Sequence, residues 1–379
     1  MNELNQVTKV SAIYVCPVRG LVDLQPPEPK RLGQAAGVAK NLGVDRLDIP
    51  VLEESLFLPS REKITYLDGL VQALDQLDAK GMQASLILPA QKILGLTWVI
   101  PDLARPLTHP DATPVFVAGK VRSLKPYHWW ADPLIIQKRL RAFREALSAV
   151  EGHPALKGLF LMDRALGWQR PNVEEALFFI QALITETQER GTAWGRVAIG
   201  LGWEDLMEPE LAKRVAEKVE HIRMGGIENF PGGVEGLDNL AEEILLAAFV
   251  GTMASWLFAR AIEVEAGWRA SREHGDALAE AGGRFGRQGL EGVSWLTLAD
   301  PEPSLRAAPP WANRTDLQKA GLLDHRLEPK PWVEEWIREM KSARISKKAF
   351  DFIDISVEDY SEDPGMHVLR LWDHFKNTF

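Results

Sequence analysis

The chain has 379 residues, of which 46% are hydrophobic and 26% are charged, and this composition is typical of a soluble globular protein. Its net charge of −9 argues against binding to nucleic-acid backbones or to anionic membranes, because both require a basic surface. A single cysteine, Cys16, rules out a disulfide framework, and its place in the run SAIYVCP predicts a buried small hydrophobe.

Short β-branched runs alternate along the chain with longer helical patterns. Strands are predicted at 11–17, 45–51, 82–89, 156–163, 196–203, 220–226, 255–265 and 292–300. The helices predicted between them span about 29–41, 61–80, 133–150, 173–188, 208–218, 237–251 and 271–285, and a last helix begins near Pro331. Ser60 and Asn172 are the predicted N-caps of the helices that they precede.

Eight strand–helix units in succession predict a (β/α)8 TIM barrel, since each crossover is long enough to join parallel strands. No G-x-G-x-x-G or Walker A motif follows a strand, so nucleotide-binding folds lose support. We expect the barrel domain to span residues 1–340, with a long loop at 90–132 after the third strand. Residues 341–379 would form a C-terminal extension made of a short strand, an acidic turn and an amphipathic helix.

The seventh predicted strand, within WLFARAIEVEAGW, carries two acids at its C-terminal end. Side chains alternate in direction along a strand, so the small residues and the two acids, Glu263 and Glu265, are expected to point into the barrel. Arg260 fits the helix-facing side poorly. Glu265 would then lie at the mouth, where substrates of such barrels bind. Two alternatives remain: both acids form salt bridges in the lumen, or the strand ends earlier and they are solvated.

Four segments together resemble the retaining glycoside hydrolases of the cellulase-like barrel clan: VEAGW, GHPALKGLFLMDR, GVSWLTLAD and GLLDHRLEPKPW. The resemblance covers roughly residues 10–337. It implies that Glu265 is the nucleophile and that Trp295 forms the floor of a sugar subsite.

This sequence departs from the clan's pattern at positions that carry charge. Asp163 stands where the clan has Asn, and Arg164 stands where it has the acid/base Glu. Arginine does not exchange a proton near neutral pH, so it cannot serve as that acid/base. Asp48 occupies the second-strand position where many members carry an Arg that supports the nucleophile.

Double displacement needs two carboxyl groups about 5–5.5 Å apart, and inversion needs about 6.5–9.5 Å. Asp163 is the nearest replacement for the missing acid/base, while Glu204 and Glu228 follow strands five and six on the same face. Arg164 would either bind an acidic sugar or silence catalysis. We therefore expect an acid lying about 5–10 Å from Glu265 in an open cleft to favour an enzyme, and a buried Arg164–Glu265 pair to disfavour hydrolysis.

Aromatic residues near the mouth suit the faces of sugar rings. The loop cluster His128, Trp129 and Trp130 would contact a sugar, and Trp268 would stack on it, although packing within the loop is the alternative. Neither H-x-H nor H-E-x-x-H occurs, and G-x-S-x-G is also absent, so we expect no metal site, no cofactor and no serine nucleophile.

The sequence thus predicts a glycoside-hydrolase-like protein that acts on or binds a short oligosaccharide or glycoside, with a degenerate or rearranged acid/base. The alternative is a catalytically inactive barrel that serves as an interaction or scaffold protein. The N-terminal residues lack a signal-peptide pattern, and no membrane-spanning run is evident, so a cytoplasmic location is expected. The C-terminal extension would cover the barrel or contact a second subunit or another protein.

Overall fold

The structure is a computed structural model of the chain. It describes residues 7–378, with gaps at 22–23, 91, 104–112, 118–119, 125–127, 165, 167–170, 191–193, 232–239 and 270–274.

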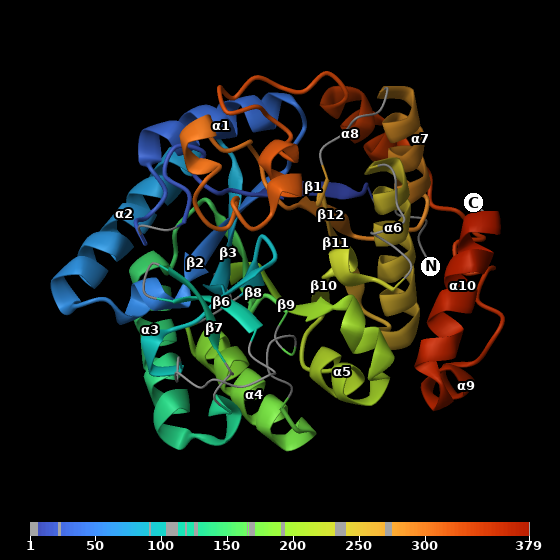
Figure 1. The fold of residues 1–379 in the computed structure, drawn as a ribbon, viewed down its shortest axis with the longest axis horizontal. Coiled ribbons are helices and arrows are strands. Elements are labelled where there is room, and N and C mark those ends of the chain that lie inside the picture. The colour runs from blue at the N-terminus through green and yellow to red at the C-terminus, as the bar shows by residue number, and fades with distance from the viewer. Residues whose placement is uncertain are drawn as a thin grey trace.

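Eight parallel strands close into a barrel, as the alternation predicted (Figure 1). The ring is completed because β1 pairs with both β2 and β12. The architecture is therefore a (β/α)8 barrel. Its strands are β1 (Lys9–Ile13), β2 (Arg46–Leu52), β3 (Gln83–Ala90), β8 (Leu156–Leu161), β9 (Arg196–Gly202), β10 (His221–Gly225), β11 (Ala261–Ala266) and β12 (Gly292–Trp295).

The helices begin where the sequence supplies good first-turn residues. Asn172 caps its helix as predicted, because its side chain accepts the backbone N–H of Glu175 while the Glu175 carboxylate accepts that of Asn172. Ser60 is not a cap: Pro59 takes that place and Ser60 is the first helical residue. The surrounding helices are α1 (Pro29–Asn41), α2 (Ser60–Ala79), α3 (Pro133–Val150), α4 (Val173–Glu189), α5 (Pro209–Ala216), α6 (Leu240–Phe258), α7 (Gly275–Gly286) and α8 (Val333–Ser342).

The predicted seventh strand is partly helix. The segment Ser255–Phe258 forms the last turn of α6, Ala259 adopts a left-handed conformation at φ 51°, and β11 begins only at Ala261. Arg260 therefore precedes the strand, and its Nε donates to the carbonyl oxygen of Ala216. The prediction failed because α6 is buried around nearly its whole circumference, so its sequence is apolar without helical periodicity.

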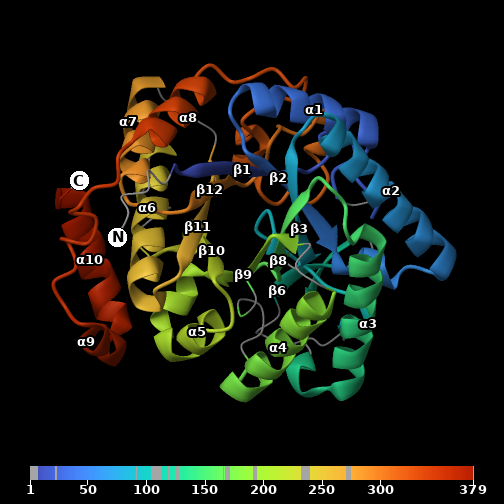
Figure 2. The same ribbon diagram turned by 180° about the vertical axis from the view of Figure 1, so that it is seen from behind.

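The predicted long loop contains a second, four-stranded sheet. Figure 1 shows this sheet in front of the barrel ring, and Figure 2 shows the ring from behind. It has its own small core, in which the rings of Trp98 and Phe116 lie 4.1 Å apart between centroids. Its strands are β4 (Lys92–Ile93), β5 (Leu96–Trp98), β6 (Thr113–Val117) and β7 (Lys120–Leu124).

The C-terminal extension packs on the outside of α6. It contains α9 (Val357–Glu362) and α10 (Pro364–Thr378), and residues 343–356 form turns and coil instead of the predicted strand. The rings of Trp372 and Phe375 lie 5.3 and 5.6 Å from that of Phe249 in α6. In both views α10 lies along α6 (Figures 1 and 2). The extension thus covers a helix of the barrel, whereas a contact with a second subunit stays a prediction.

Within the described part of the chain, α6 is the one helix whose length and apolar composition would allow it to cross a membrane. The apolar stretch that qualifies is 72% buried between the barrel and the extension, as expected for a core helix.

Candidate active site

A network of buried charges fills the barrel lumen. The carboxylate of Glu263, on β11, accepts hydrogen bonds from Arg46 at 2.8 Å, Arg223 at 2.8 Å and Arg196 at 3.2 Å. These arginines come from β2, β10 and β9, so Glu263 must point inward, as the alternation predicted. Burial alone would raise the pKa of Glu263, but the guanidinium groups hold it below its usual range. Its role in the lumen is therefore that of an ion-paired carboxylate.

Asp48 belongs to the same network. Arg46 Nε donates to it at 2.7 Å, Ser294 Oγ donates at 3.0 Å, and Arg223 also donates to its carboxylate. The resemblance suggested a loss of positive charge at this level of the barrel. Arg46 and Arg223 supply that charge from other positions, two residues earlier on β2 and across the lumen on β10.

Two carboxyl groups meet at the mouth of the barrel. Asp163, directly after β8 and Met162, is hydrogen-bonded to Glu265 on β11, and the two residues are 5% and 1% exposed. Burial raises the pKa of Asp163. Burial and the charge of Asp163 raise the pKa of Glu265 well above its usual range. Both shifts favour a state of the pair in which one of its two carboxyl groups is protonated.

Arg164 lies beside this pair but forms its main ion pair elsewhere. Its Nη1 and Nη2 donate to the two carboxylate oxygens of Glu228 at 2.7 and 3.0 Å, and Nη2 is 3.9 Å from Glu265 Oε2. Burial alone would lower the pKa of Arg164, but Glu228 and Glu265 raise it, so the guanidinium stays charged. The structure therefore brings Asp163, Arg164, Glu228 and Glu265 together.

The backbone that presents Asp163 is strained. Met162 and Arg164, on either side of it, have φ values of 57° and 49°, in the left-handed region that non-glycine residues rarely adopt. Such strain persists where the surrounding structure enforces it, and it is concentrated at functional sites.

Glu204 reaches the same face from the short helix η5 (Trp203–Met207) after β9. Its carboxylate approaches the backbone so closely that a Cβ atom on Gly226 would lie 2.9 Å from Oε2. Gly226 has a φ of 81°, in the left-handed region that favours glycine. The guanidinium of Arg164 lies beside the same glycine, so Glu204 and Arg164 are neighbours at the mouth.

Trp268 and Trp295 have different surroundings. Trp268 lies at the mouth, with the guanidinium carbons of Arg164 and Arg314 at 5.2 and 5.0 Å from its ring centroid. Trp295 does not face the mouth: it packs against Trp332 and Trp336, with ring centroids 5.5 and 4.8 Å away. The neighbouring residue Ser294 points into the lumen, so alternation directs Trp295 outward and the predicted sugar floor is wrong.

The aromatic cluster of the long loop is part of the core. Trp129 and Trp130 are 1% and 2% exposed, and they stack on each other with centroids 4.0 Å apart. Arg139 covers the Trp129 ring at 3.7 Å, and Phe179 of α4 meets its edge. His128 instead faces outward and contacts Glu175 at 3.1 Å. The alternative of packing within the loop therefore describes these tryptophans, and neither indole face is open to a sugar.

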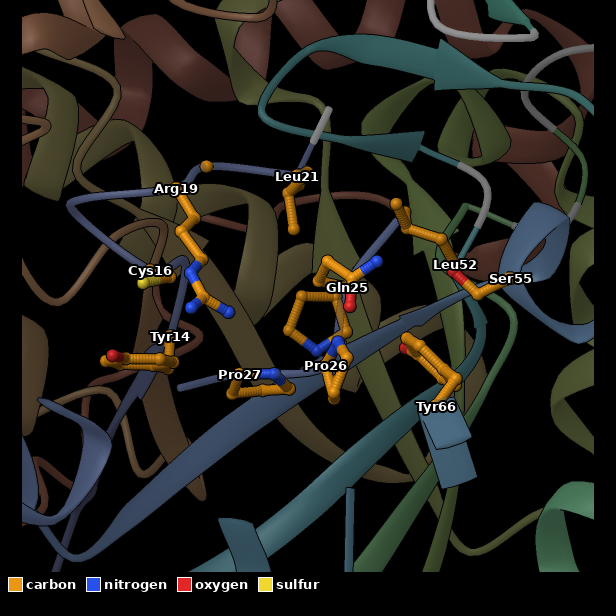
Figure 3. Close-up of a pocket in the computed structure, with 12 residues that line it drawn as sticks. Tyr14, Cys16, Arg19, Leu21, Gln25, Pro26, Pro27, Leu52, Ser55 and Tyr66 are labelled. Atoms are coloured by element: carbon orange, nitrogen blue, oxygen red, sulfur yellow. The ribbon is translucent and has the colours of Figure 1, made fainter. Parts of the chain in front are cut away.

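A small cavity lies on the same face of the barrel, at the ends of β1 and β2. Figure 3 shows Gln25 between Arg19, from the loop after β1, and Tyr66, from α2. Its volume of about 20 Å³ suits a single water molecule. Cys16 lines this cavity as a buried free thiol, in keeping with the prediction. The cavity is too small for a sugar ring.

Sequence reasoning missed the basic side chains of the site. Arg46 and Arg196 lie within predicted strands, at inward positions, and this placement was an available signal. Lys92 carried no such signal, because the second sheet that holds it was not predicted. Among the described residues, no cluster of His, Cys, Asp and Glu could hold a metal ion.

The closed ring of eight parallel strands defines the class of fold as a (β/α)8 barrel. No protein-family model and no curated protein matches the chain in sequence.

Solved structures with this fold include several glycoside hydrolases. A GH5_18 protein from Streptomyces cattleya, solved with GlcNAc, is 14% identical at a TM-score of 0.63, covering 88% of this chain and 80% of its own. An exo-beta-1,4-mannosidase from Opitutaceae bacterium strain TAV5 is 13% identical at a TM-score of 0.64, covering 91% of this chain and 61% of its own. A GH5_18 protein from Bifidobacterium longum subsp. infantis is 12% identical at a TM-score of 0.64, covering 90% and 80%. At these identities the likeness is one of fold.

Proposed function

We propose that this protein binds a short glycoside at the mouth of the barrel and does not hydrolyse it by double displacement. The observation that carries the proposal is the hydrogen-bonded pair of Asp163 and Glu265 beside Arg164. Retaining hydrolysis requires an anomeric carbon between two carboxyl groups about 5–5.5 Å apart. Carboxyl groups joined by a hydrogen bond leave no room for that carbon.

The charge state of the mouth points the same way. A nucleophilic Glu265 must be ionised, but burial and Asp163 favour its protonated form. Arg164 occupies the place of the acid/base, and its bidentate pairing with Glu228 keeps it there. These groups still offer hydrogen-bond donors and acceptors to sugar hydroxyls. Trp268 is only 1% exposed, with Arg164 and Arg314 over its ring, so its predicted role as a stacking surface has no support.

The alternative of a scaffold or interaction protein has less support. Its predicted surfaces were the C-terminal extension and the aromatic loop. Trp372 and Phe375 of the extension are packed on α6, and Trp129 and Trp130 are buried. Within the proposed binding role, a cytoplasmic location stays a prediction that would limit ligands to short glycosides.

Calorimetric titration with methyl glycosides and with Manβ1-4GlcNAc, the disaccharide bound by a similar barrel, tests the proposal. We expect the wild-type protein to bind at least one of them, and Glu265→Ala to weaken binding at least about tenfold. Such a loss corresponds to one hydrogen bond that involves a charged group. Glu280→Gln, on the exposed surface of α7, is the matched control and should leave binding unchanged.

Hydrolysis is followed in parallel with aryl glycosides. We expect no turnover by the wild-type protein above that of Glu265→Gln, because the carboxyl pair cannot perform the two steps. Turnover that disappears in Glu265→Gln would overturn the non-hydrolytic part of the proposal. Failure to bind every glycoside tested would overturn the binding part.

A further inference from the structure

A cleft of about 900 Å³ lies at the N-terminal end of the barrel, opposite the mouth. It is lined by the first residues of three strands, Arg196 of β9, His221 of β10 and Ala261 of β11. The last turns of α4 and the connections that precede β10 and β11 complete the lining. Ligand pockets for small organic molecules have volumes of about 300–1,000 Å³. The cleft is therefore large enough for such a ligand, and it is separate from the candidate site.

Apolar side chains reach the surface of the cleft. Val197 and Ala261 are half-buried there, and Ala259 is exposed. The backbone at Ala259 is left-handed, with a φ of 51°, and strain of this kind is concentrated at functional sites. A ligand with an apolar body would remove these side chains from water, which favours binding.

Two buried nitrogen atoms of the lining residues lack a hydrogen-bond partner among the residues that the structure describes. They are Nε1 of Trp194, a residue that is 3% exposed, and Nε of Arg196. The other two nitrogens of Arg196 are engaged, because Nη1 donates to Glu263 at 3.2 Å and Nη2 lies 3.0 Å from Glu291. Both unpaired atoms are N–H donors, so an occupant that satisfies them must bring hydrogen-bond acceptors.

Arg260 adds a positive charge that has no counter-ion in the described part of the chain. Its Nε donates to the carbonyl oxygen of Ala216 at 3.1 Å and its Nη1 to that of Ala259 at 3.2 Å, so its partners there are neutral. The acids that line the cleft, Glu217 and Glu220, are exposed, whereas Arg260 is half-buried. Because solvent screens exposed charges more strongly than buried ones, Arg260 favours an anion as the occupant.

We propose that this cleft binds an amphipathic organic anion, a molecule with an apolar body and a carboxylate, sulfonate or phosphate group. The charged group lies near Arg260, and its oxygen atoms accept the N–H groups of Trp194 and Arg196. Binding here does not depend on the proposed binding of glycosides, because the two sites lie at opposite ends of the barrel.

Titration with two fluorescent dyes, anilinonaphthalene sulfonate (ANS) and phenylnaphthylamine, tests the proposal. The dyes share one ring system, and only ANS carries an anionic group. We expect one ANS molecule to bind per chain, at least about fivefold more tightly than the uncharged dye, because the sulfonate adds hydrogen bonds to charged donors. Equal affinities for the two dyes, or no saturable binding of ANS, would overturn the proposal.

Two variants locate the bound dye. Trp194→Phe removes the unpaired N–H group and should weaken ANS binding about fivefold, the effect of one hydrogen bond. Trp203→Phe is the matched control and should leave binding unchanged, because Trp203 Nε1 is also buried without a described partner but lies in η5, beyond the other end of β9.

Arg260→Gln removes the positive charge, so it should weaken ANS binding at least about fivefold and leave the binding of phenylnaphthylamine unchanged. A change in the shape of the cleft would weaken the binding of both dyes. An equal loss for both dyes in Arg260→Gln would therefore contradict the assigned role of Arg260 and overturn the choice of an anion. An ANS affinity that neither Trp194→Phe nor Arg260→Gln alters would show that the dye binds elsewhere.

Discussion

Replacing Glu263 with glutamine is expected to lower the free energy of unfolding by about 3–5 kcal/mol. Glu263 is 1% exposed and accepts hydrogen bonds from Arg46, Arg196 and Arg223. Glutamine keeps the shape of the side chain but removes its charge, so three buried guanidinium groups lose their common counter-ion. Breaking a buried ion pair from one side costs more than the pair contributes, because the remaining charge is left without compensation. Urea denaturation at pH 7 measures the effect.

Two further variants separate this cause from a general loss of stability. Glu280→Gln breaks an exposed pair with Arg284 on α7 and should change the free energy of unfolding by about 0.5 kcal/mol or less. Adding Arg196→Gln to Glu263→Gln should recover part of the loss, because it removes one of the uncompensated charges. The explanation is wrong if Glu263→Gln is as stable as Glu280→Gln. It is also wrong if the double variant loses more free energy of unfolding than the sum of the losses in Glu263→Gln and Arg196→Gln.

Replacing Glu243 with glutamine is expected to have the opposite effect, a gain in stability that grows with pH. Glu243, in α6, is fully buried, and its Oε1 accepts the backbone N–H groups of Gly267 and Trp268 at 2.8 Å each. Burial raises the pKa of Glu243 to about 7, despite these two hydrogen bonds. A glutamine carbonyl oxygen can accept the same two bonds without a charge in the core.

The sign of the pH dependence follows from the raised pKa. Between about pH 4.5 and 7 the folded protein holds the Glu243 proton while the unfolded chain releases it, so the wild-type protein loses stability as pH rises through this window. The contribution is fully present below about pH 4.5 and absent above about pH 7. Glu243→Gln lacks this group, so its stability relative to the wild type should rise by about 3 kcal/mol from pH 4.5 to pH 8.

Denaturation of both proteins at several pH values provides the test, and the difference between the two curves cancels the other titrating groups. Glu53→Gln is the matched control, because Glu53 is also buried but pairs with the guanidinium of Arg139. That variant should lose stability at every pH in the window. A difference between Glu243→Gln and wild type that does not change with pH would show that Glu243 is ionised in the folded protein at pH 5.

The buried charges of the lumen and the charges of the mouth have different roles, one in stability and one in the proposed binding. Glu263 is ionised and tied to three arginines, so it supports the barrel and is unavailable to a ligand. Glu265, two residues later on the same strand, is hydrogen-bonded to Asp163, and its Oε1 has no hydrogen-bond partner among the residues that the structure describes. The proposed binding role depends on this second acid, whereas the stability of the barrel depends on the first.

The sequence by itself determined the architecture and the direction of the key side chains. Alternation of strands and helices predicted the closed barrel, and the period of two along β11 predicted that Glu263 and Glu265 point inward. Both patterns are local: each depends on residues that are neighbours in the chain. The same local reasoning failed where burial removes periodicity, so the end of α6 was read as strand. The resemblance, and not periodicity, gave the wrong role for Trp295, which alternation along β12 directs away from the lumen.

Only the tertiary structure decided which charged groups meet. Asp163 follows β8 and Glu265 lies on β11, yet their side chains are hydrogen-bonded to each other. Arg164 is paired with Glu228, which lies 64 residues away in sequence. Such pairings depend on barrel closure, strand stagger and the paths of the loops, none of which leaves a periodic signal in the sequence. The second sheet over the mouth places Lys92 beside these groups for the same reason. The contacts between charged side chains at the mouth therefore form only when the barrel closes and brings the ends of different strands together.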